Sequence, residues 1–491
     1  MIRLLMIQPE NREIRRFRRL QLNNFSQLTM PYLAAFVDER HYKITLADEC
    51  CGRIPYRKPF DLVAITVSTP NAPHSYGIAE RFRKAGAKIV MGGPHATLLP
   101  DEVEEHCDFL LAGEGEAAWP QFLEDFRRGS AQKLYAPSAP ARLENLPAPR
   151  WDLLKRRRSM KGAIFATRGC PYRCRYCNLK QIYPDSFRTR PIEDVAAEIA
   201  AMPSRIFVFW DDNLFADKDY AKALFRAIAP LKRKWAAQAT LRDCADDGLL
   251  ALAKAAGCLY LFVGLESFSE KALGDAGKGI NRVADYAPLV GKIHRHGIMI
   301  QAGIVFGFDS DTPGVFDATL DACEKLGIDG ATASLLTPFP KTPIYWQLKS
   351  EGRLLSEDWS AYNSKTAVAY RPLNMSADEL WRGYARFRRR FYSLGSFVRR
   401  MSASRTNVAV NLAINLGYRL SLEWGAGRKR EQREQREQEW EQRERSVRRS
   451  GTSGAGAGTT GSDRAGAGRP EAESGAATVG TGGRGSGQGG P

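Results

Sequence analysis

Short apolar segments alternate with helix-length segments along the first 130 residues of this 491-residue chain. Strands that alternate with helices form a parallel sheet with helices on both faces. Residues 1–130 therefore predict a doubly wound α/β domain, with ligands expected in the crevice beyond the carboxyl ends of its strands. The expected strands are residues 3–8, 43–47, 61–67, 88–91 and 109–111.

A second strand–helix series follows a Pro-rich segment, residues 131–160, which predicts a linker. Six strand–helix units fill residues 161–340, so this part predicts a second α/β domain with its own core. Its expected strands are residues 163–167, 205–210, 236–241, 259–264, 299–306 and 330–336.

Three cysteines follow the first strand of the second series in a Cys-x-x-x-Cys-x-x-Cys run: Cys170, Cys174 and Cys177. A structural zinc site takes four ligands, and residues 178–183 supply no fourth Cys or His. A four-iron cluster normally takes four cysteines, so three leave one iron open for another ligand. The alternatives are a distorted zinc knuckle or three buried thiols. The other six cysteines are expected to be mostly buried apolar residues: Cys50, Cys51, Cys107, Cys244, Cys258 and Cys323.

The cysteine run, with Tyr176 before its last Cys and a strand before its first, resembles the radical S-adenosylmethionine superfamily. This resemblance implies a partial (βα)6 barrel with its chemistry at the carboxyl ends of the strands. It also implies a [4Fe-4S] cluster held by Cys170, Cys174 and Cys177, with S-adenosylmethionine on the open iron.

The resemblance extends to groups that follow the later barrel strands. Asp211, Asp212 and Asn213 follow the second strand, where the family receives the amino group of S-adenosylmethionine; the alternative is a helix N-cap. Further S-adenosylmethionine contacts are expected from Arg242, Glu266, Ser267, Gly303 and Gly307, although glycines also mark tight packing. Lys341 stands where many relatives have Gly.

Residues 1–130 resemble the Rossmann-like cobalamin-binding domain that precedes many radical S-adenosylmethionine enzymes. The resemblance rests on 92–95, Gly-Gly-Pro-His, and 113–116, Gly-Glu-Gly-Glu. The Asp-x-His-x-x-Gly signature is absent after the first strand, so no residue is assigned to cobalt. A Rossmann-like domain without the cofactor is the alternative. The residues expected at cobalamin are Ser68, Thr69, Gly92, Gly93, His95, Gly113, Glu114 and Gly115, and His74 is a further candidate for the pocket lining.

The family resemblance implies a radical enzyme that cleaves S-adenosylmethionine to methionine and a 5′-deoxyadenosyl radical, with cobalamin-dependent C-methylation of an unactivated carbon as its reaction. The substrate is expected to be a natural product or lipid-type metabolite. The first alternative is a radical cyclase, ring-rearranging or oxidative enzyme with the same two domains. A methylthiotransferase acting on RNA should carry other terminal domains. A non-enzymatic iron–sulfur protein should lack the groups at the strand ends.

The formal net charge of +17 allows nucleic-acid binding. The basic runs at 155–158 and 386–390 lack aromatic stacking partners, so we expect a solvated basic face and no nucleic acid. No signal peptide or transmembrane segment is expected. The chain is therefore expected in the cytoplasm, with a small-molecule substrate and an electron donor such as flavodoxin or ferredoxin.

The remaining residues predict two different segments. Residues 341–426 predict a helical C-terminal extension whose last part, 407–424, is expected to be a packing helix. Residues 427–491 predict a charged helix-prone segment and a Gly/Ser-rich tail that is too polar to form a core.

Overall fold

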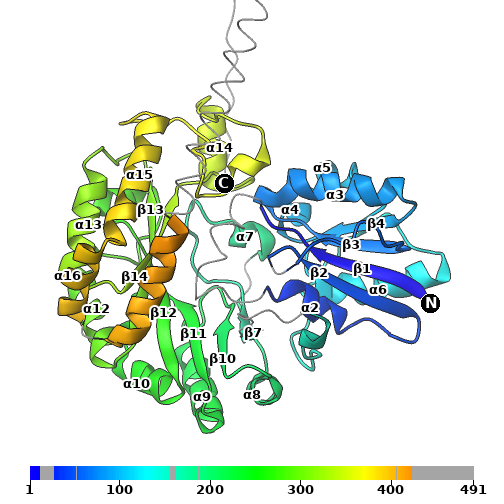
Figure 1. The fold of residues 1–491 in the computed structure, drawn as a ribbon, viewed down its shortest axis with the longest axis horizontal. Coiled ribbons are helices and arrows are strands. Elements are labelled where there is room, and N and C mark those ends of the chain that lie inside the picture. Colours follow the sequence, from blue (N-terminus) through cyan, green and yellow to red (C-terminus); the bar gives the residue numbers. More distant parts are fainter. Residues whose placement is uncertain (12–26, 51, 155–161, 185–186, 405, 423–491) are drawn as a thin grey trace, which may run out of the picture. The chain divides into compact units, whose positions relative to one another are not determined.

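The computed structural model describes residues 1–11, 27–50, 52–154, 162–184, 187–404 and 406–422 (Figure 1). All of them belong to one compact unit, Met1–Arg428. The predicted charged segment and tail, residues 427–491, lie outside the described residues. No described helix is long and apolar enough to cross a membrane.

The first sheet is parallel and has the strand order β2-β1-β3-β4-β5-β6 (Figure 1). The order reverses between β1 and β3, and an open α/β sheet binds ligands in the crevice at such a point. The predicted α/β class and its five strands are confirmed. The strands are β1 (Ile2–Gln8), β2 (Tyr42–Asp48), β3 (Leu62–Thr66), β4 (Lys88–Gly92), β5 (Phe109–Leu111) and β6 (Leu134–Tyr135).

Strand β1 shows why both faces of this sheet are covered. Leu4 and Met6 lie in one buried cluster, while Leu5 and Ile7 lie in another, because successive side chains of a strand point to opposite faces. A continuous apolar run is typical of a parallel strand with helices on both sides. The helices are α2 (Thr29–Ala34), α3 (Ala72–Lys84), α4 (Pro94–Leu98), α5 (Pro100–Glu104) and α6 (Gly115–Arg128).

Strand β6 lies inside the segment that the sequence predicts as a linker. Leu110 and Leu111 of β5 pair with Leu134 and Tyr135, and the Tyr135 side chain is buried in the first domain. The first sheet therefore extends beyond residue 130. Proline-rich chain without strands begins only after this edge strand.

The second sheet is also parallel, with the order β14-β13-β12-β11-β10-β7 and its first and last strands at opposite edges. It is the predicted six-stranded partial barrel (Figure 1). Its strands are β7 (Gly162–Ile164), β10 (Ile206–Phe209), β11 (Lys234–Ala239), β12 (Cys258–Glu266), β13 (Met299–Phe306) and β14 (Gly330–Leu335).

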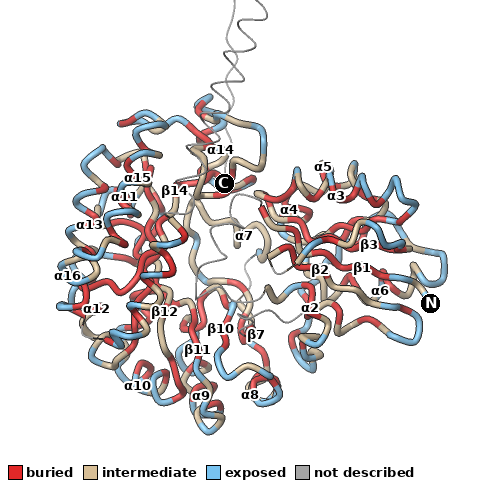
Figure 2. The backbone as a smooth tube through the Cα atoms, viewed as in Figure 1, coloured by how far each residue is buried: buried red, intermediate tan, exposed pale blue. Residues whose placement is uncertain are grey.

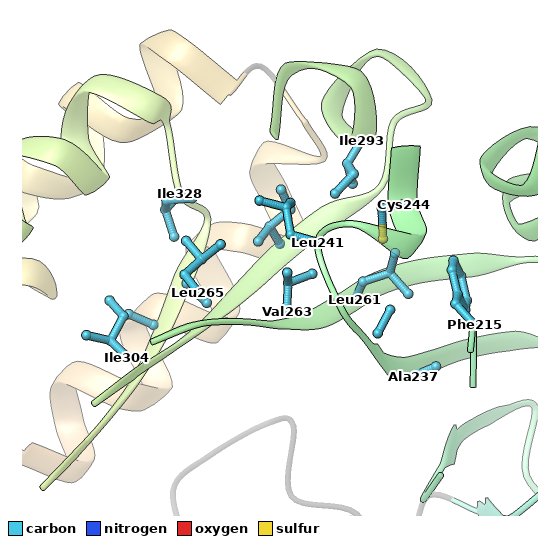
Figure 3. Packing of buried hydrophobic residues seen from close by; sticks show 14 of the residues in the cluster. Phe215, Ala237, Leu241, Cys244, Leu261, Val263, Leu265, Ile293, Ile304 and Ile328 are labelled. Carbon is cyan, nitrogen blue, oxygen red and sulfur yellow. The ribbon is translucent and has the colours of Figure 1, made fainter. Parts of the chain in front are cut away.

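Helices follow the barrel strands and cover their outer face. Buried side chains of β11, β12 and β13 pack beside Ile293 of α12 in one large core (Figure 3). The strands are mostly buried, although four residues of β12 are only half-buried, whereas the helices expose their outer faces (Figure 2). The helices are α8 (Ile192–Ala201), α9 (Lys218–Ile228), α10 (Asp247–Ala255), α11 (Glu270–Asp275), α12 (Tyr286–Arg295) and α13 (Val315–Leu326).

A two-stranded antiparallel ribbon follows β7. It consists of β8 (Thr167–Arg168) and β9 (Arg188–Thr189), and Arg168 pairs with Arg188 in its register. The chain between the two strands carries the three cysteines and the one-turn helix α7 (Leu179–Ile182). The ribbon therefore forms the base of the cysteine loop.

The described residues after the barrel are mainly helical, as predicted: α14 (Pro343–Ser350), α15 (Ala377–Phe391), α16 (Leu394–Ser404) and a helix at 408–422. The guanidinium of Arg400 is fully buried and donates to the carbonyls of Ile328, Asp329 and Phe391. These bonds hold the last helices against the start of β14. Short 3-10 helices lie at Thr69–Asn71, Trp151–Leu153, Ala229–Leu231, Asp243–Ala245, Val283–Asp285 and Trp359–Ala361.

Candidate functional site

The three cysteines of the run lie together in the loop after β8. Burial, together with the nearby charges of Cys174, Asp212 and Cys170, raises the pKa of the Cys177 thiol to about 12. The pKa of Cys170 and that of Cys174 are also raised, mainly by burial. Bound metal ions reverse this effect because they stabilise thiolates. The remaining cysteines in the described residues are buried, as expected, except Cys50, which is half-buried.

The chemistry of this donor set distinguishes between two kinds of site. In the described parts of the chain, no three His, Cys, Asp or Glu side chains stand close enough to hold one metal ion. A structural zinc ion needs four such ligands around a single centre. A four-iron cluster normally takes four cysteine thiolates. Three neighbouring thiols, one fewer than that number, therefore fit a cluster that leaves one iron open.

The cysteine loop is held by contacts to three other parts of the barrel. The Tyr172 hydroxyl donates to Asp243 Oδ1 over 3.2 Å, and the Arg175 backbone N–H donates to the Ala276 carbonyl over 2.9 Å. The Arg175 side chain donates to Gln347 Oε1 on α14 over 2.6 Å. These bonds fix the shape of the loop with protein groups alone.

Asp211 and Asp212, predicted at the amino group of S-adenosylmethionine, have different surroundings. Asp211 is buried and accepts hydrogen bonds from the Thr167 N–H, the Thr167 hydroxyl and the Ala166 N–H. Its carboxylate thereby ties β10 to β8. Asp212 is less buried; burial raises its pKa to about 6, while the Gly169 N–H beside Cys170 lowers it. Of the two carboxylates, that of Asp212 lies nearer the cysteines.

Asn213, the third predicted residue of this group, is buried against the next strand end. Its Nδ2 donates to Asp243 Oδ2 over 2.9 Å, and its Oδ1 has no hydrogen-bond partner. A buried polar atom without a partner is uncommon and suggests a missing ligand or water. Asn213 therefore fits a place at a cofactor.

Glu266 and Lys278 form a buried ion pair at the end of β12. Lys278 Nζ lies 2.5 Å from Glu266 Oε1, and both side chains are less than one-tenth exposed. The charges of Cys174 and Cys170 act on Lys278, which places its ammonium near these two cysteines. No motif in the sequence predicted a role for Lys278. Lys278 lies in a loop, and the one feature that marks it in the sequence is its place between two glycines.

An irregularity in β12 presents Glu266. The pairing with β13 shifts between Gly264 and Glu266, and Glu266 has a φ of 65°. Such a left-handed residue is uncommon outside glycine and often occurs at functional sites. Asn281 Nδ2 holds the bulge by donating to the Gly264 and Leu265 carbonyls.

Ser267, Gly303 and Gly307 have packing roles in the described contacts. The Ser267 Oγ accepts from the Ser269 N–H over 3.2 Å. A Cβ at Gly303 would lie 2.8 Å from the Phe262 ring, so this glycine lets two strands approach closely. Gly307 has a φ of 108°, which favours glycine. Their contacts to S-adenosylmethionine stay predictions.

Arg242 lines a surface cavity of about 410 Å³ rather than the group around the cysteines. Arg282 also lines it, and both arginines are exposed. Asp243, the next residue, turns the other way to accept from Tyr172 of the cysteine loop.

His95, predicted at cobalamin, is fully buried, and its ring packs edge-on against Trp359 from the segment after the barrel. Its Nδ1 lies 3.2 Å from Thr69 Oγ1 and its Nε2 lies 3.4 Å from Glu102 Oε1. Gly93 has a φ of 103°, and a Cβ there would lie 2.7 Å from Thr66 Oγ1. These groups join the loops after β3 and β4.

The other loop residues after β3 and β4 also have protein partners. Ser68 caps the turn at Thr69–Asn71, and its N–H donates to Asn71 Oδ1 over 2.8 Å. Gly92 ends β4 against Leu111 of β5. The His74 ring lies 2.7 Å from Glu49 at the end of β2. Their contacts to cobalamin stay predictions.

Gly113 leaves open space at the carboxyl end of β5. It has a φ of 88°, and a Cβ there would meet nothing within 4 Å, whereas one at Gly115 would lie 3.0 Å from Leu33 Cδ2. A bulky ligand therefore has room beside Gly113. Glu114, the next residue, pairs with Arg168 and Arg188 of the ribbon under the cysteine loop.

Three family models match successive parts of the chain. Residues 26–123 match the B12 binding domain, residues 164–340 match the radical SAM superfamily, and residues 342–435 match a domain of unknown function, DUF4070.

Three curated relatives align along most of the chain. The bacteriochlorophyllide d C-12(1)-methyltransferase of Chlorobaculum tepidum is 30% identical and covers 76% of this chain and 84% of its own. The C-8(2)-methyltransferase of the same organism is 26% identical, covering 70% and 82%. The anaerobic magnesium-protoporphyrin IX monomethyl ester cyclase of Cereibacter sphaeroides is 23% identical, covering 68% and 60%.

A solved structure shares the fold. The radical S-adenosylmethionine methyltransferase TsrM from Kitasatospora setae, with cobalamin and a [4Fe-4S] cluster bound, has a TM-score of 0.60 at 17% identity, covering 78% of this chain and 88% of its own. Together with the domain matches, these relatives show that the chain belongs to the radical S-adenosylmethionine superfamily, in the group of enzymes with an N-terminal cobalamin-binding domain, and uses a [4Fe-4S] cluster, S-adenosylmethionine and cobalamin.

Proposed function

We propose that this enzyme transfers a methyl group from S-adenosylmethionine, by way of cobalamin, to an unactivated carbon of a small molecule. One observation carries the proposal: Glu114 and Glu116, at the carboxyl end of β5, pair directly with Arg168, two residues before Cys170. The loop where cobalamin is expected thus lies against the loop where the cluster is expected.

The residues of this chain divide the work of binding. Cys170, Cys174 and Cys177 would hold the cluster, which supplies the electron that cleaves S-adenosylmethionine. Asp212 and Asn213 would accept hydrogen bonds from the amino group of S-adenosylmethionine. The open face at Gly113 would take cobalamin, which supplies a methyl group. The buried surroundings exclude water from reactive species.

Carbon is the expected methyl acceptor because two relatives that align over most of this chain are named as methyltransferases acting at numbered carbon positions. The two bacteriochlorophyllide methyltransferases align over 84% and 82% of their own lengths, against 60% for the cyclase. A tetrapyrrole is therefore the first substrate class to test, with bacteriochlorophyllide d as the probe. A radical cyclase or oxidative enzyme is the less supported alternative.

The reaction also needs an external electron. We propose a small acidic protein such as flavodoxin or ferredoxin as donor, and the cytoplasm as location because thiols stay reduced there. The exposed Arg242 and Arg282 beside the 410 Å³ cavity suit an acidic partner, since complementary charges speed encounter. Asp243 connects this cavity to the cysteine loop through Tyr172.

Anaerobic reconstitution with iron, sulfide and hydroxocobalamin tests the proposal. The purified protein should show the visible spectra of both groups. With deuteromethyl-labelled S-adenosylmethionine, a low-potential reductant and bacteriochlorophyllide d, it should produce 5′-deoxyadenosine and S-adenosylhomocysteine. Replacement of Cys174 by Ala should abolish 5′-deoxyadenosine, whereas Cys323→Ala, in the barrel core, should leave it. Production of 5′-deoxyadenosine without bound cobalamin would favour the rearrangement chemistry instead.

A further inference from the structure

Arg168 makes a two-pronged contact across the two domains. Its Nη1 lies 2.9 Å from Glu114 Oε2 and its Nη2 lies 2.5 Å from Glu116 Oε1. The three side chains are about one-tenth exposed. One planar guanidinium therefore binds two carboxylates of the cobalamin-binding domain at once.

Arg188 strengthens this contact from the other strand of the ribbon. It stands opposite Arg168 in the β8–β9 register, donates to Glu114 and also donates to the Ala141 carbonyl over 2.6 Å. Two arginines and two glutamates leave the group without net charge. Charges this deeply buried persist only when they are paired and hydrogen-bonded.

The guanidinium of Arg168 holds the carboxylates of Glu114 and Glu116 in a fixed arrangement. A guanidinium donates in a fixed plane, so its two carboxylates are set in position relative to each other and to the backbone of residue 168. The Phe165 ring lies 4.7 Å from the Arg168 guanidinium carbon and supports this orientation. A lysine has one compact ammonium and cannot bridge the two carboxylates in the same way.

The position of Arg168 gives this geometry a role. Gly169, with a φ of 87°, separates it from Cys170, so a shift of the guanidinium would move the first cluster ligand. On the other side, Glu114 stands beside the open face of Gly113. A short path therefore links the two expected cofactor sites. It runs from Cys170 through Gly169 to Arg168, and across the ion pair of Arg168 to Glu114 beside Gly113.

We propose that Arg168 is a positioning residue that sets the cluster loop and the cobalamin loop at the separation required for methyl transfer. This inference rests on the proposed function and concerns the coupling of the two cofactors. Glu114 and Glu116 form the matching half of the device in the first domain.

The test compares Arg168→Lys with Arg190→Lys. Arg190 is also buried, and its ion pair with Glu198 (2.8 Å) lies wholly within the barrel domain. Each holoenzyme is measured for iron, cobalamin, 5′-deoxyadenosine and deuteromethyl label in the bound cobalamin. The magnetic interaction between the reduced cluster and cobalt(II) is measured by electron paramagnetic resonance.

Arg168→Lys should keep iron, cobalamin and 5′-deoxyadenosine within about twofold of wild type, while label per 5′-deoxyadenosine falls by about 100-fold, because misplacement of about 1 Å has such an effect. The magnetic interaction between cluster and cobalt in this variant should weaken. Arg190→Lys should change neither the label per 5′-deoxyadenosine nor the electron paramagnetic resonance spectrum. An unchanged ratio in Arg168→Lys, or an equal change in Arg190→Lys, would overturn the proposal.

A charge exchange provides a second route if Arg168→Lys does not fold. Arg168→Glu should lower both the label per 5′-deoxyadenosine and the magnetic interaction. The double variant Arg168→Glu with Glu116→Arg should regain at least part of both. No gain of the double variant over the single variant would contradict the pairing. Failure of the proposed function is distinguishable, because wild-type enzyme would then bind no cobalamin or transfer no label.

Discussion

Lys278 Nζ lies 2.5 Å from Glu266 Oε1 inside the barrel, near the cysteines. Burial lowers the pKa of Lys278, but the charges of Glu266, Cys174 and Cys170 and the hydrogen bond to Glu266 together outweigh burial, so that pKa stays above its ordinary value. The lysine therefore stays charged, and the pair depends on both partners.

Replacement of Lys278 by Met should leave the Glu266 carboxylate buried and unpaired. Loss of one partner of such a pair costs about 3–5 kcal/mol of unfolding free energy, whereas replacement of both partners costs less. Urea unfolding should therefore show Lys278→Met as much less stable, and Lys278→Met with Glu266→Gln as partly restored. Equal stability of the single and double variants would mean that the pair is not coupled.

Gly113 should be necessary for cobalamin binding. Gly113→Val fills the open space at the carboxyl end of β5 at a φ of 88°. Gly86→Val is a matched control, because Gly86 has a φ of 87°, equally open surroundings and a place before β4, at the other end of the sheet. Both variants carry the same strain, but only Gly113→Val should lose bound cobalamin in the visible spectrum. Equal retention in the two would place cobalamin elsewhere.

Arg282 should affect the rate at which a protein donor reduces the cluster. With flavodoxin as donor, Arg282→Glu should slow 5′-deoxyadenosine formation by about 10-fold at low salt and less at high salt, because a charge at the rim of an interface acts on the encounter rate. With dithionite, which needs no docking surface, the rate should not change. Arg389→Glu, an exposed charge on α15 outside the cavity, is the control. Equal slowing with both donors would show that the protein donor does not dock at this cavity.

Asp329 should make the docking of the last helices depend on pH. Burial raises its pKa, but hydrogen bonds and charge from His294, Ser404 and Thr406 outweigh burial, so the pKa is lowered. A carboxyl with a depressed pKa stabilises the fold above its unfolded pKa of about 3.9, and this stabilisation is lost as the pH falls through its folded pKa.

The corresponding variant is Asp329→Asn. Its deficit in unfolding free energy should be about 3–5 kcal/mol near pH 7 and should shrink as the pH falls below about 4. Asp247→Asn, which breaks exposed pairs with Lys292 and His296, should change the unfolding free energy little, because water screens exposed ion pairs. A deficit of Asp329→Asn that stays constant with pH would contradict the role of its charge.

The strands were predictable because both sheets are parallel and covered, so their apolar runs are continuous. Strand β6 was not, since two residues, Leu134 and Tyr135, carry too little pattern to distinguish an edge strand from a linker. The cysteine loop was recognisable because its ligands are close in sequence. Its wider surroundings depend on contacts between distant residues.

His95 and Lys278 illustrate this limit. His95 on α4 meets Glu102 on the next helix, α5, and no shared motif links the two in the sequence. Lys278 reaches Glu266 across α11, so spacing alone does not pair them. Likewise, neighbouring residues Asp211 and Asp212 have separate roles because the backbone at the end of β10 turns their side chains to different partners.

The most direct test of the central claim is a single anaerobic incubation of the reconstituted enzyme with deuteromethyl-labelled S-adenosylmethionine, bacteriochlorophyllide d and a low-potential reductant. Mass spectrometry should find 5′-deoxyadenosine, S-adenosylhomocysteine and deuterium label in the protein-bound cobalamin, with any methylated tetrapyrrole carrying the same label. Formation of 5′-deoxyadenosine while the bound cobalamin never acquires label would contradict cobalamin-dependent methyl transfer.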